Sequence, residues 1–148
     1  MTLATTSGLE VNRLTARGLV QIIRALDEEA ARHGLQLTDI MPVASDDYGT
    51  LRRRMVGTPL EGAVAGKTGT LVHDDGGMAS LGGVVYTQRH GKVCFVMLNQ
   101  GSGVAQSRQM TDQLLAHVIL DNDIPAQLPK PQKPRHMLES TDLEVIER

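Results

Sequence analysis

The sequence predicts an α+β fold in which a three-stranded antiparallel sheet has one helix before it and one after it. Two segments with helical periodicity enclose three short apolar runs in the chain of 148 residues. Only short turns rich in glycine and charged residues separate these runs. Such turns are too short for helical crossovers, so neighbouring strands should be antiparallel. The length suits one ordinary domain with a real core.

The first helix is predicted over residues 15–33. Thr15 is a suitable N-cap, and Gly34 follows a basic pair as a C′ glycine does. Pro42 ends any further helical segment, and the polar residues 45–49 indicate a loop. The apolar residues that recur at the spacing of one helix face are Leu19, Ile22, Ile23, Leu26 and Ala30.

Three strands are predicted over residues 63–71, 79–87 and 92–99. The connecting turns are residues 73–77 and 88–91, whose lengths fit antiparallel hairpins. The second and third strands should form a meander. Their apolar residues are nearly continuous, as expected of strands covered on both faces. We therefore expect helices to pack on this sheet.

The second helix is predicted over residues 105–120, because apolar residues from Met110 to Ile119 recur at helical spacing. The periodicity is then lost. Four of the six prolines lie between Pro125 and Pro134, interleaved with basic residues. This composition indicates an extended tail. We therefore divide the chain into residues 1–123, a compact portion, and residues 124–148, a Pro-rich charged tail.

Composition and charge exclude several classes of function. The net charge is −2 and aromatic residues make up 2%, so the chain lacks the basic, aromatic surface of a nucleic-acid-binding protein. No apolar stretch is long enough to span a membrane, and residues 1–6 show no export signal. The single cysteine, Cys94, lies in an apolar run and is expected in the core. His73, Asp74 and Asp75 are more typical of a solvated turn than of a metal site.

The sharpest local motif is Lys67-Thr68-Gly69-Thr70, at the end of the first predicted strand. One interpretation is a solvent-facing strand end followed by a turn. Another is the tail of a phosphate-binding loop, but the leading glycine of that pattern would fall at Glu61, and no helix start follows Thr68. Nucleotide binding is therefore disfavoured. A third interpretation is the Lys-Thr-Gly box of serine penicillin-recognising enzymes, which belongs on a strand.

An ordered series of short motifs supports the third interpretation. Together these motifs resemble the C-terminal part of the D-alanyl-D-alanine carboxypeptidase/endopeptidase family, the class C low-molecular-mass penicillin-binding proteins, over about residues 7–120. The resemblance implies the last portion of a transpeptidase-like (beta-lactamase-like) domain. The motifs are Ser7-Gly8-Leu9, Asn12-Arg13-Leu14-Thr15, Met41-Pro42-Val43-Ala44, Gly49-Thr50-Leu51 and Lys67-Thr68-Gly69-Thr70.

The same resemblance implies a serine-type hydrolase that acts on peptidoglycan peptides through an acyl-enzyme, in the periplasm or another extracytoplasmic space, without metal or organic cofactor. A peptidoglycan peptide or a beta-lactam would be the ligand. Lys67 and the hydroxyls of Thr68 and Thr70 would meet its terminal carboxylate. By the resemblance, the Thr70 N–H would form half of the oxyanion hole, and Gly69 would keep side-chain bulk away.

The nucleophile motif is missing from these 148 residues. None of the six serines has a lysine three places on or an asparagine two places on, so Ser-x-x-Lys and Ser-x-Asn are both absent. In the family both would lie upstream of Ser7. The chain would thus carry half of an active site, with an upstream half of the same domain as its partner. The alternative, a non-catalytic fragment or interaction module with the same fold, stays open.

Overall fold

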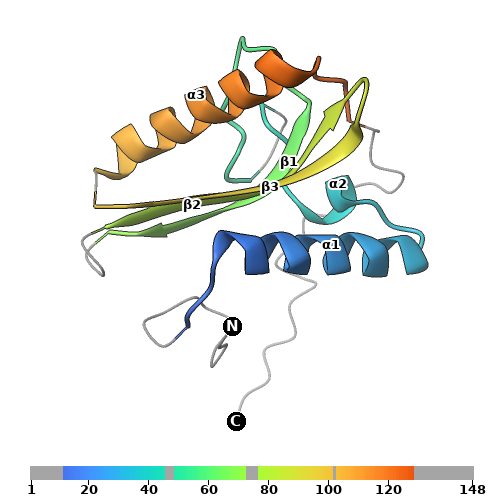
Figure 1. Cartoon of the computed structure of the whole chain (residues 1–148), viewed down its shortest axis with the longest axis horizontal. Helices are drawn as coiled ribbons and strands as arrows, with labels where there is room; N and C mark the ends of the chain where they lie inside the picture. Colours follow the sequence, from blue (N-terminus) through green and yellow to red (C-terminus); the bar gives the residue numbers. More distant parts are fainter. Residues whose placement is uncertain (1–11, 46–48, 73–76, 102, 129–148) are drawn as a thin grey trace, which may run out of the picture.

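The computed structural model confirms the α+β fold (Figure 1). It describes residues 12–45, 49–72, 77–101 and 103–128. The three strands form one antiparallel sheet in the order β1-β2-β3, so the predicted meander is confirmed. The elements in chain order are α1 (Ala16–Arg32), α2 (Leu37–Ile40), β1 (Val64–Leu71), β2 (Met78–Thr87), β3 (Gly91–Gln100) and α3 (Val104–Asn122).

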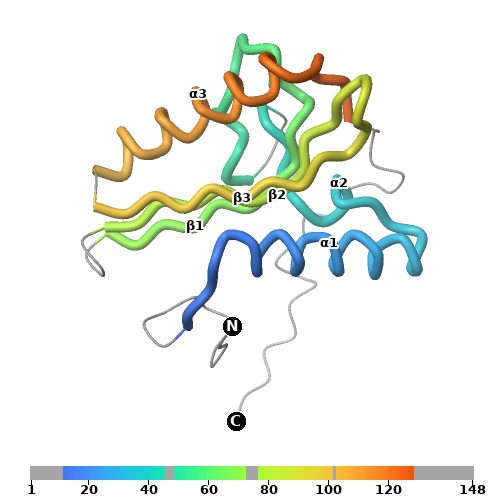
Figure 2. The backbone as a smooth tube through the Cα atoms, in the orientation of Figure 1, coloured from blue at the N-terminus to red at the C-terminus, as the bar shows by residue number. Residues whose placement is uncertain are grey.

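The two long helices cover opposite faces of the sheet, as the trace in Figure 2 shows. α1 packs chiefly against β3, and α3 packs chiefly against β2. Because side chains alternate along a strand, β2 sends Leu81 and Val85 to one face and Val84 to the other. This two-sided burial accounts for the nearly continuous apolar runs in the sequence.

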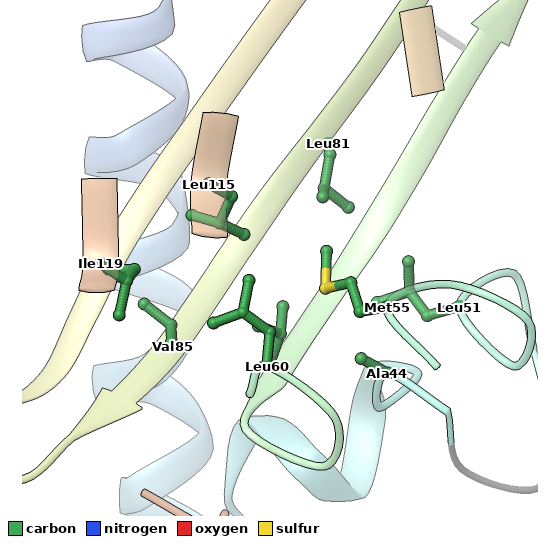
Figure 3. Packing of buried hydrophobic residues seen from close by; sticks show 9 residues of the cluster. Ala44, Leu51, Met55, Leu60, Leu81, Val85, Leu115 and Ile119 are labelled. Atoms are coloured by element: carbon green, nitrogen blue, oxygen red, sulfur yellow. The ribbon is translucent and has the colours of Figure 1, made fainter. Parts of the chain in front are cut away.

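The larger of the two cores lies on the α3 side of the sheet (Figure 3). Leu115 and Ile119 of α3 pack there against β2, together with residues of the long loop between α2 and β1. That loop has no regular secondary structure between residues 49 and 63, yet it contributes Leu51 and Leu60, which are fully buried. The members are Ala44, Leu51, Met55, Leu60, Val64, Leu81, Val85, Leu115 and Ile119.

The ends of α1 follow the predicted capping residues. The Thr15 hydroxyl accepts a hydrogen bond from the Gly18 N–H at 3.1 Å, and Gly34 has φ +66°, the left-handed conformation expected at C′. Ile23 and Ala30 are the buried residues of this helix. The short helix α2 was not predicted. The Asp39 carboxylate accepts the Gln36 N–H at its start, a local contact within a helix of only four residues.

The first residues of the predicted tail, 124–128, lie against the sheet. Pro125 bridges to Thr87, and Leu128 is 9% exposed. The Gln88 N–H donates to the Ile124 carbonyl at 2.9 Å, and the Ala126 N–H donates to the Tyr86 carbonyl at 2.8 Å. This segment therefore pairs with the end of β2, on the same side of β2 as β1. Residues 129–148 lie outside the described residues, and the division at residue 123 stays a prediction.

Asp123 joins the end of α3 to the turn between β2 and β3. Its side chain is 3% exposed and accepts the backbone N–H groups of Arg89, His90 and Ile124 at 2.7–3.3 Å. His90 Nδ1 lies 2.5 Å from its Oδ2 atom. Desolvation favours the neutral acid, but the hydrogen bonds from Ile124, His90, Thr87 and Arg89 outweigh it and hold the pKa of Asp123 well below its usual range.

Because this pKa is depressed in the folded state, the stability that Asp123 contributes is present above its unfolded value of 3.8 and is lost as the pH falls toward the folded value. We expect the free energy of unfolding to fall more steeply between about pH 5 and about pH 2 in the wild type than in Asp123→Asn. Urea unfolding at several pH values measures this slope. Asp121→Asn, an exposed control two residues earlier, should follow the wild type; equal slopes for wild type and Asp123→Asn would contradict the assignment.

A pair of glycines lets β1 lie close to β2. Gly66 and Gly83 are opposite each other in the register. A Cβ at Gly83 would come within 2.0 Å of the Ala65 carbonyl oxygen and 2.6 Å of Gly66 Cα, and these backbone atoms cannot move without displacing the strand. At the adjacent Gly82 a Cβ would meet the ends of two side chains, Ile23 and Val96, at 3.3 Å, and the Phe95 carbonyl oxygen at an ordinary contact distance of 3.7 Å. The position of β1 therefore depends on Gly83.

Gly83→Ala should lower the free energy of unfolding by about 2 kcal/mol or more, because it forces β1 away from β2. It should also shift the amide NMR signals of Lys67 to Thr70. Gly82→Ala, the matched control on the same strand, should cost less than about 1 kcal/mol, because side-chain ends can adjust. Similar losses for the two variants would show that backbone approach at Gly83 does not position β1.

Candidate functional site

The predicted motif lies on β1, at the edge of the sheet (Figure 1). The first residues of this strand, Val64 to Gly66, are buried, and residues 42–44 pair with the outer edge of the strand there. The Ala44 N–H donates to the Val64 carbonyl at 2.8 Å, and the Gly66 N–H donates to the Pro42 carbonyl at 2.9 Å. From Lys67 onward, no strand within the described parts of the chain covers the outer side.

The backbone groups of Thr68 and Thr70 point toward this uncovered edge. In an antiparallel pair the N–H and C=O of one residue face the same side, and the side alternates from residue to residue. Val64 and Gly66 bond outward to residues 42–44, whereas the Ala63 carbonyl accepts the Tyr86 N–H of β2. Even-numbered residues of β1 therefore face outward. Odd-numbered residues, including Lys67 and Gly69, face β2.

Lys67 places its ammonium group at the same edge. Its side chain is exposed, and Nζ donates to the Thr68 carbonyl at 2.6 Å. Among the described residues, no carboxylate forms an ion pair with this lysine. The positive charge is therefore available to an anionic ligand that reaches the outward face of Thr68.

Thr70 is contacted by a residue that the sequence did not single out. Arg108, in the first turns of α3, donates from Nη2 to the Thr70 hydroxyl at 3.0 Å. Nothing in the sequence distinguished this arginine from an ordinary exposed helix residue. Only the packing of α3 over the sheet brings it to β1.

Gly69 is also exposed, and a Cβ there would lie 2.4 Å from the Ser80 hydroxyl oxygen on β2. The absence of a side chain thus makes room for Ser80. The four predicted residues, Lys67, Thr68, Gly69 and Thr70, are together on one exposed strand end. Lys67 and the outward backbone of Thr68 are in direct contact.

Of the other candidates from the sequence, those that the structure describes are not brought to this site. Cys94 is half-buried against the core on the α1 side, and burial, reinforced by nearby Asp27, raises the pKa of its thiol, which suits a packing residue. Residues 66–68 lie within a strand rather than at a helix start, so the disfavoured phosphate-loop geometry is absent there. His73, Asp74 and Asp75 lie outside the described residues, as does Ser7-Gly8-Leu9.

Within the described ranges, no three His, Cys, Asp or Glu side chains gather as a metal site would require. The same ranges contain no helix with the length and apolar character needed to cross a membrane. An apolar groove of about 430 Å³ lies between β3 and α3, and none of the four motif residues lines it. The groups that the described residues place at the edge of β1 are backbone groups, hydroxyls and cations.

Two solved structures share the fold. A predatory endopeptidase from Bdellovibrio bacteriovorus, acylated by penicillin G and in complex with an immunity protein, matches with a TM-score of 0.72 and 20% identity, over 87% of this chain and 35% of that chain. Penicillin-binding protein 4 from Haemophilus influenzae, complexed with a beta-lactam, matches with a TM-score of 0.56 and 22% identity, over 72% of this chain and 27% of that chain.

This chain therefore spans about a third of the length of these two solved proteins. No curated protein matches its sequence significantly. The family model of the D-Ala-D-Ala carboxypeptidase 3 (S13) family matches residues 1–119, a range that includes α1, the sheet and the whole 67–70 motif. By this match over most of its length, the chain belongs to the D-Ala-D-Ala carboxypeptidase 3 (S13) family.

Proposed function

We propose that the outer edge of β1 binds the carboxyl-terminal end of a D-Ala-D-Ala peptide, as one half of the active site of a serine-type D-Ala-D-Ala carboxypeptidase or endopeptidase. The observation that carries the proposal is the outward-facing backbone of Thr68 and Thr70, with the Lys67 ammonium at the same edge. The family of the chain supports the choice of ligand.

An extended peptide can pair with an exposed strand edge through main-chain hydrogen bonds. β1 offers such an edge only beyond Gly66, because residues 42–44 occupy the earlier part. The peptide would therefore align beside residues 67–70. Its terminal carboxylate would be met by Lys67 and the hydroxyls of Thr68 and Thr70, through charge-assisted hydrogen bonds.

The chemical step would use the outward N–H of Thr70. In acyl transfer, a serine oxygen forms an ester with the carbonyl carbon, the serine proton passes to the nitrogen, the peptide C–N bond breaks, and the terminal D-Ala leaves as the amine. Water then hydrolyses the ester and releases the serine. The negative charge that develops on the carbonyl oxygen needs hydrogen-bond donors placed in advance. The Thr70 N–H would be one donor, and the serine residue would supply the other. Gly69 would keep the approach free of side-chain bulk.

The serine itself would come from a segment outside these 148 residues, since none of the serines present has the Ser-x-x-Lys pattern. A beta-lactam would bind at the same edge, as an acylating analogue of the peptide. The penicillin G acylation of the endopeptidase with the same fold is consistent with this. A peptidoglycan substrate would place the reaction in the periplasm or another extracytoplasmic space.

A second candidate is a non-catalytic fragment or interaction module with the same fold. Apolar side chains that are 46–62% exposed favour it. They include Ile40, Val56, Met110 and Leu114. Binding of the peptide to β1 separates the two candidates, because an interaction module has no reason to recognise a D-Ala-D-Ala terminus.

The Lys67→Ala variant tests the site. Titration of the chain with diacetyl-L-Lys-D-Ala-D-Ala, followed by amide NMR, should show binding at residues 67–70. Lys67→Ala should weaken it about tenfold or more, because one charge-assisted hydrogen bond is lost. Lys92→Ala removes an ammonium from the opposite edge strand and should leave the affinity unchanged.

All three proteins should fold cooperatively, which thermal unfolding checks. An equal affinity in the wild type and Lys67→Ala would show that Lys67 is only a solvent-facing residue at a strand end. A wild-type chain whose 67–70 signals do not respond to the peptide would contradict the proposed function.

A further inference from the structure

Arg108 approaches the motif from the opposite side of the strand to Lys67. Side chains alternate along β1, so Thr70 shares the α3 face with Val64, while Lys67 projects from the other face. The Arg108 guanidinium meets the Thr70 hydroxyl at 3.0 Å. Within the described part of the chain, it has no carboxylate partner. The edge of β1 therefore has one unneutralised cation on each side.

The backbone that carries Arg108 is held in place by a second arginine. Arg54, in the loop before β1, bonds to both carboxylate oxygens of Asp112, with Nε at 2.7 Å from Oδ2. Its Nη2 also donates to the Arg108 carbonyl at 3.2 Å. The Arg54 and Asp112 side chains are 11% and 21% exposed, so this ion pair is partly shielded from water. Asp112, one turn from Arg108, is thus engaged by Arg54.

The chemistry of the two groups fixes the direction of the hydrogen bond. A guanidinium has donors only, so the Thr70 hydroxyl oxygen must accept. A hydroxyl has one proton, and that proton remains available for a second partner. Arg108 therefore leaves Thr70 ready to donate to an anion at the edge of β1, and polarises the hydroxyl toward such donation.

We propose that Arg108 is a positioning residue for carboxylate recognition: it holds the Thr70 hydroxyl as a donor toward the carboxylate and acts through that hydroxyl. This inference rests on the proposed function, because it assumes that the carboxyl end of the peptide reaches Thr70. It assigns to Arg108 the preference for a charged terminus over a neutral one.

The test compares two ligands, diacetyl-L-Lys-D-Ala-D-Ala and its C-terminal amide, by amide NMR titration of the 148-residue chain. The wild type should prefer the carboxylate. Arg108→Ala should weaken carboxylate binding about tenfold and leave amide binding nearly unchanged. The ratio of the two affinities should therefore fall about tenfold. Arg108→Lys should recover part of the preference. Arg89→Ala, which removes an exposed arginine near the other end of β2, should bind both ligands as the wild type does.

A double-mutant cycle separates positioning from general stability. If Arg108 acts through the hydroxyl, Arg108→Ala should add little further loss in a Thr70→Val background. Thr70→Val alone should reproduce most of the effect, which keeps the inference testable if Arg108→Ala does not fold. Additive losses, or equal losses for the carboxylate and the amide, would overturn the role of Arg108.

The outcomes distinguish this inference from the proposed function. If Lys67→Ala loses the preference for the carboxylate and Arg108→Ala keeps it, the inference fails while the proposed function stands. If the wild type binds neither ligand at residues 67–70, the proposed function fails and the inference fails with it.

Discussion

The one-sided pairing of β1 is the constraint on which the rest of the site depends. Odd-numbered residues of β1 bond to β2, so the even-numbered ones must satisfy their backbone groups elsewhere. Residues 42–44 do this for Val64 and Gly66. Beyond them, Thr68 and Thr70 present their groups at an edge where Lys67 adds a positive charge. An edge strand left open in this way is a liability unless a ligand or partner uses it.

Two polar contacts fix the position of α3 over the sheet. Near its middle, the Arg54–Asp112 ion pair ties the helix to the loop before β1, and that loop fills the larger core with Leu51 and Leu60. At its end, the Asp123 carboxylate accepts hydrogen bonds from backbone N–H groups of the turn between β2 and β3. Between these two contacts, Leu115 packs against β2. The same placement brings Arg108 to Thr70.

Much of the fold could be predicted because its signals are local. The Thr15 cap, Gly34 and the three apolar runs depend on residues close together in the chain, and the structure confirms each. Apart from the four-residue helix α2, the missed features are contacts between distant segments. Arg54 and Asp112 are 58 positions apart, and Asp123 bonds to residues more than 30 positions away. The motif at residues 67–70 was visible as a sequence, but its outward backbone became clear only from the pairing of residues 42–44.

Amide hydrogen exchange along β1 tests the central claim most directly. In the free chain, the Lys67 and Gly69 amides should exchange slowly because they bond to β2, while the outward amides of Thr68 and Thr70 should exchange fast. Saturation with diacetyl-L-Lys-D-Ala-D-Ala should slow amide exchange at Thr68 and Thr70 selectively, by about tenfold or more, because the peptide pairs with the edge. Unchanged exchange at Thr68 and Thr70 in the saturated complex would contradict the account.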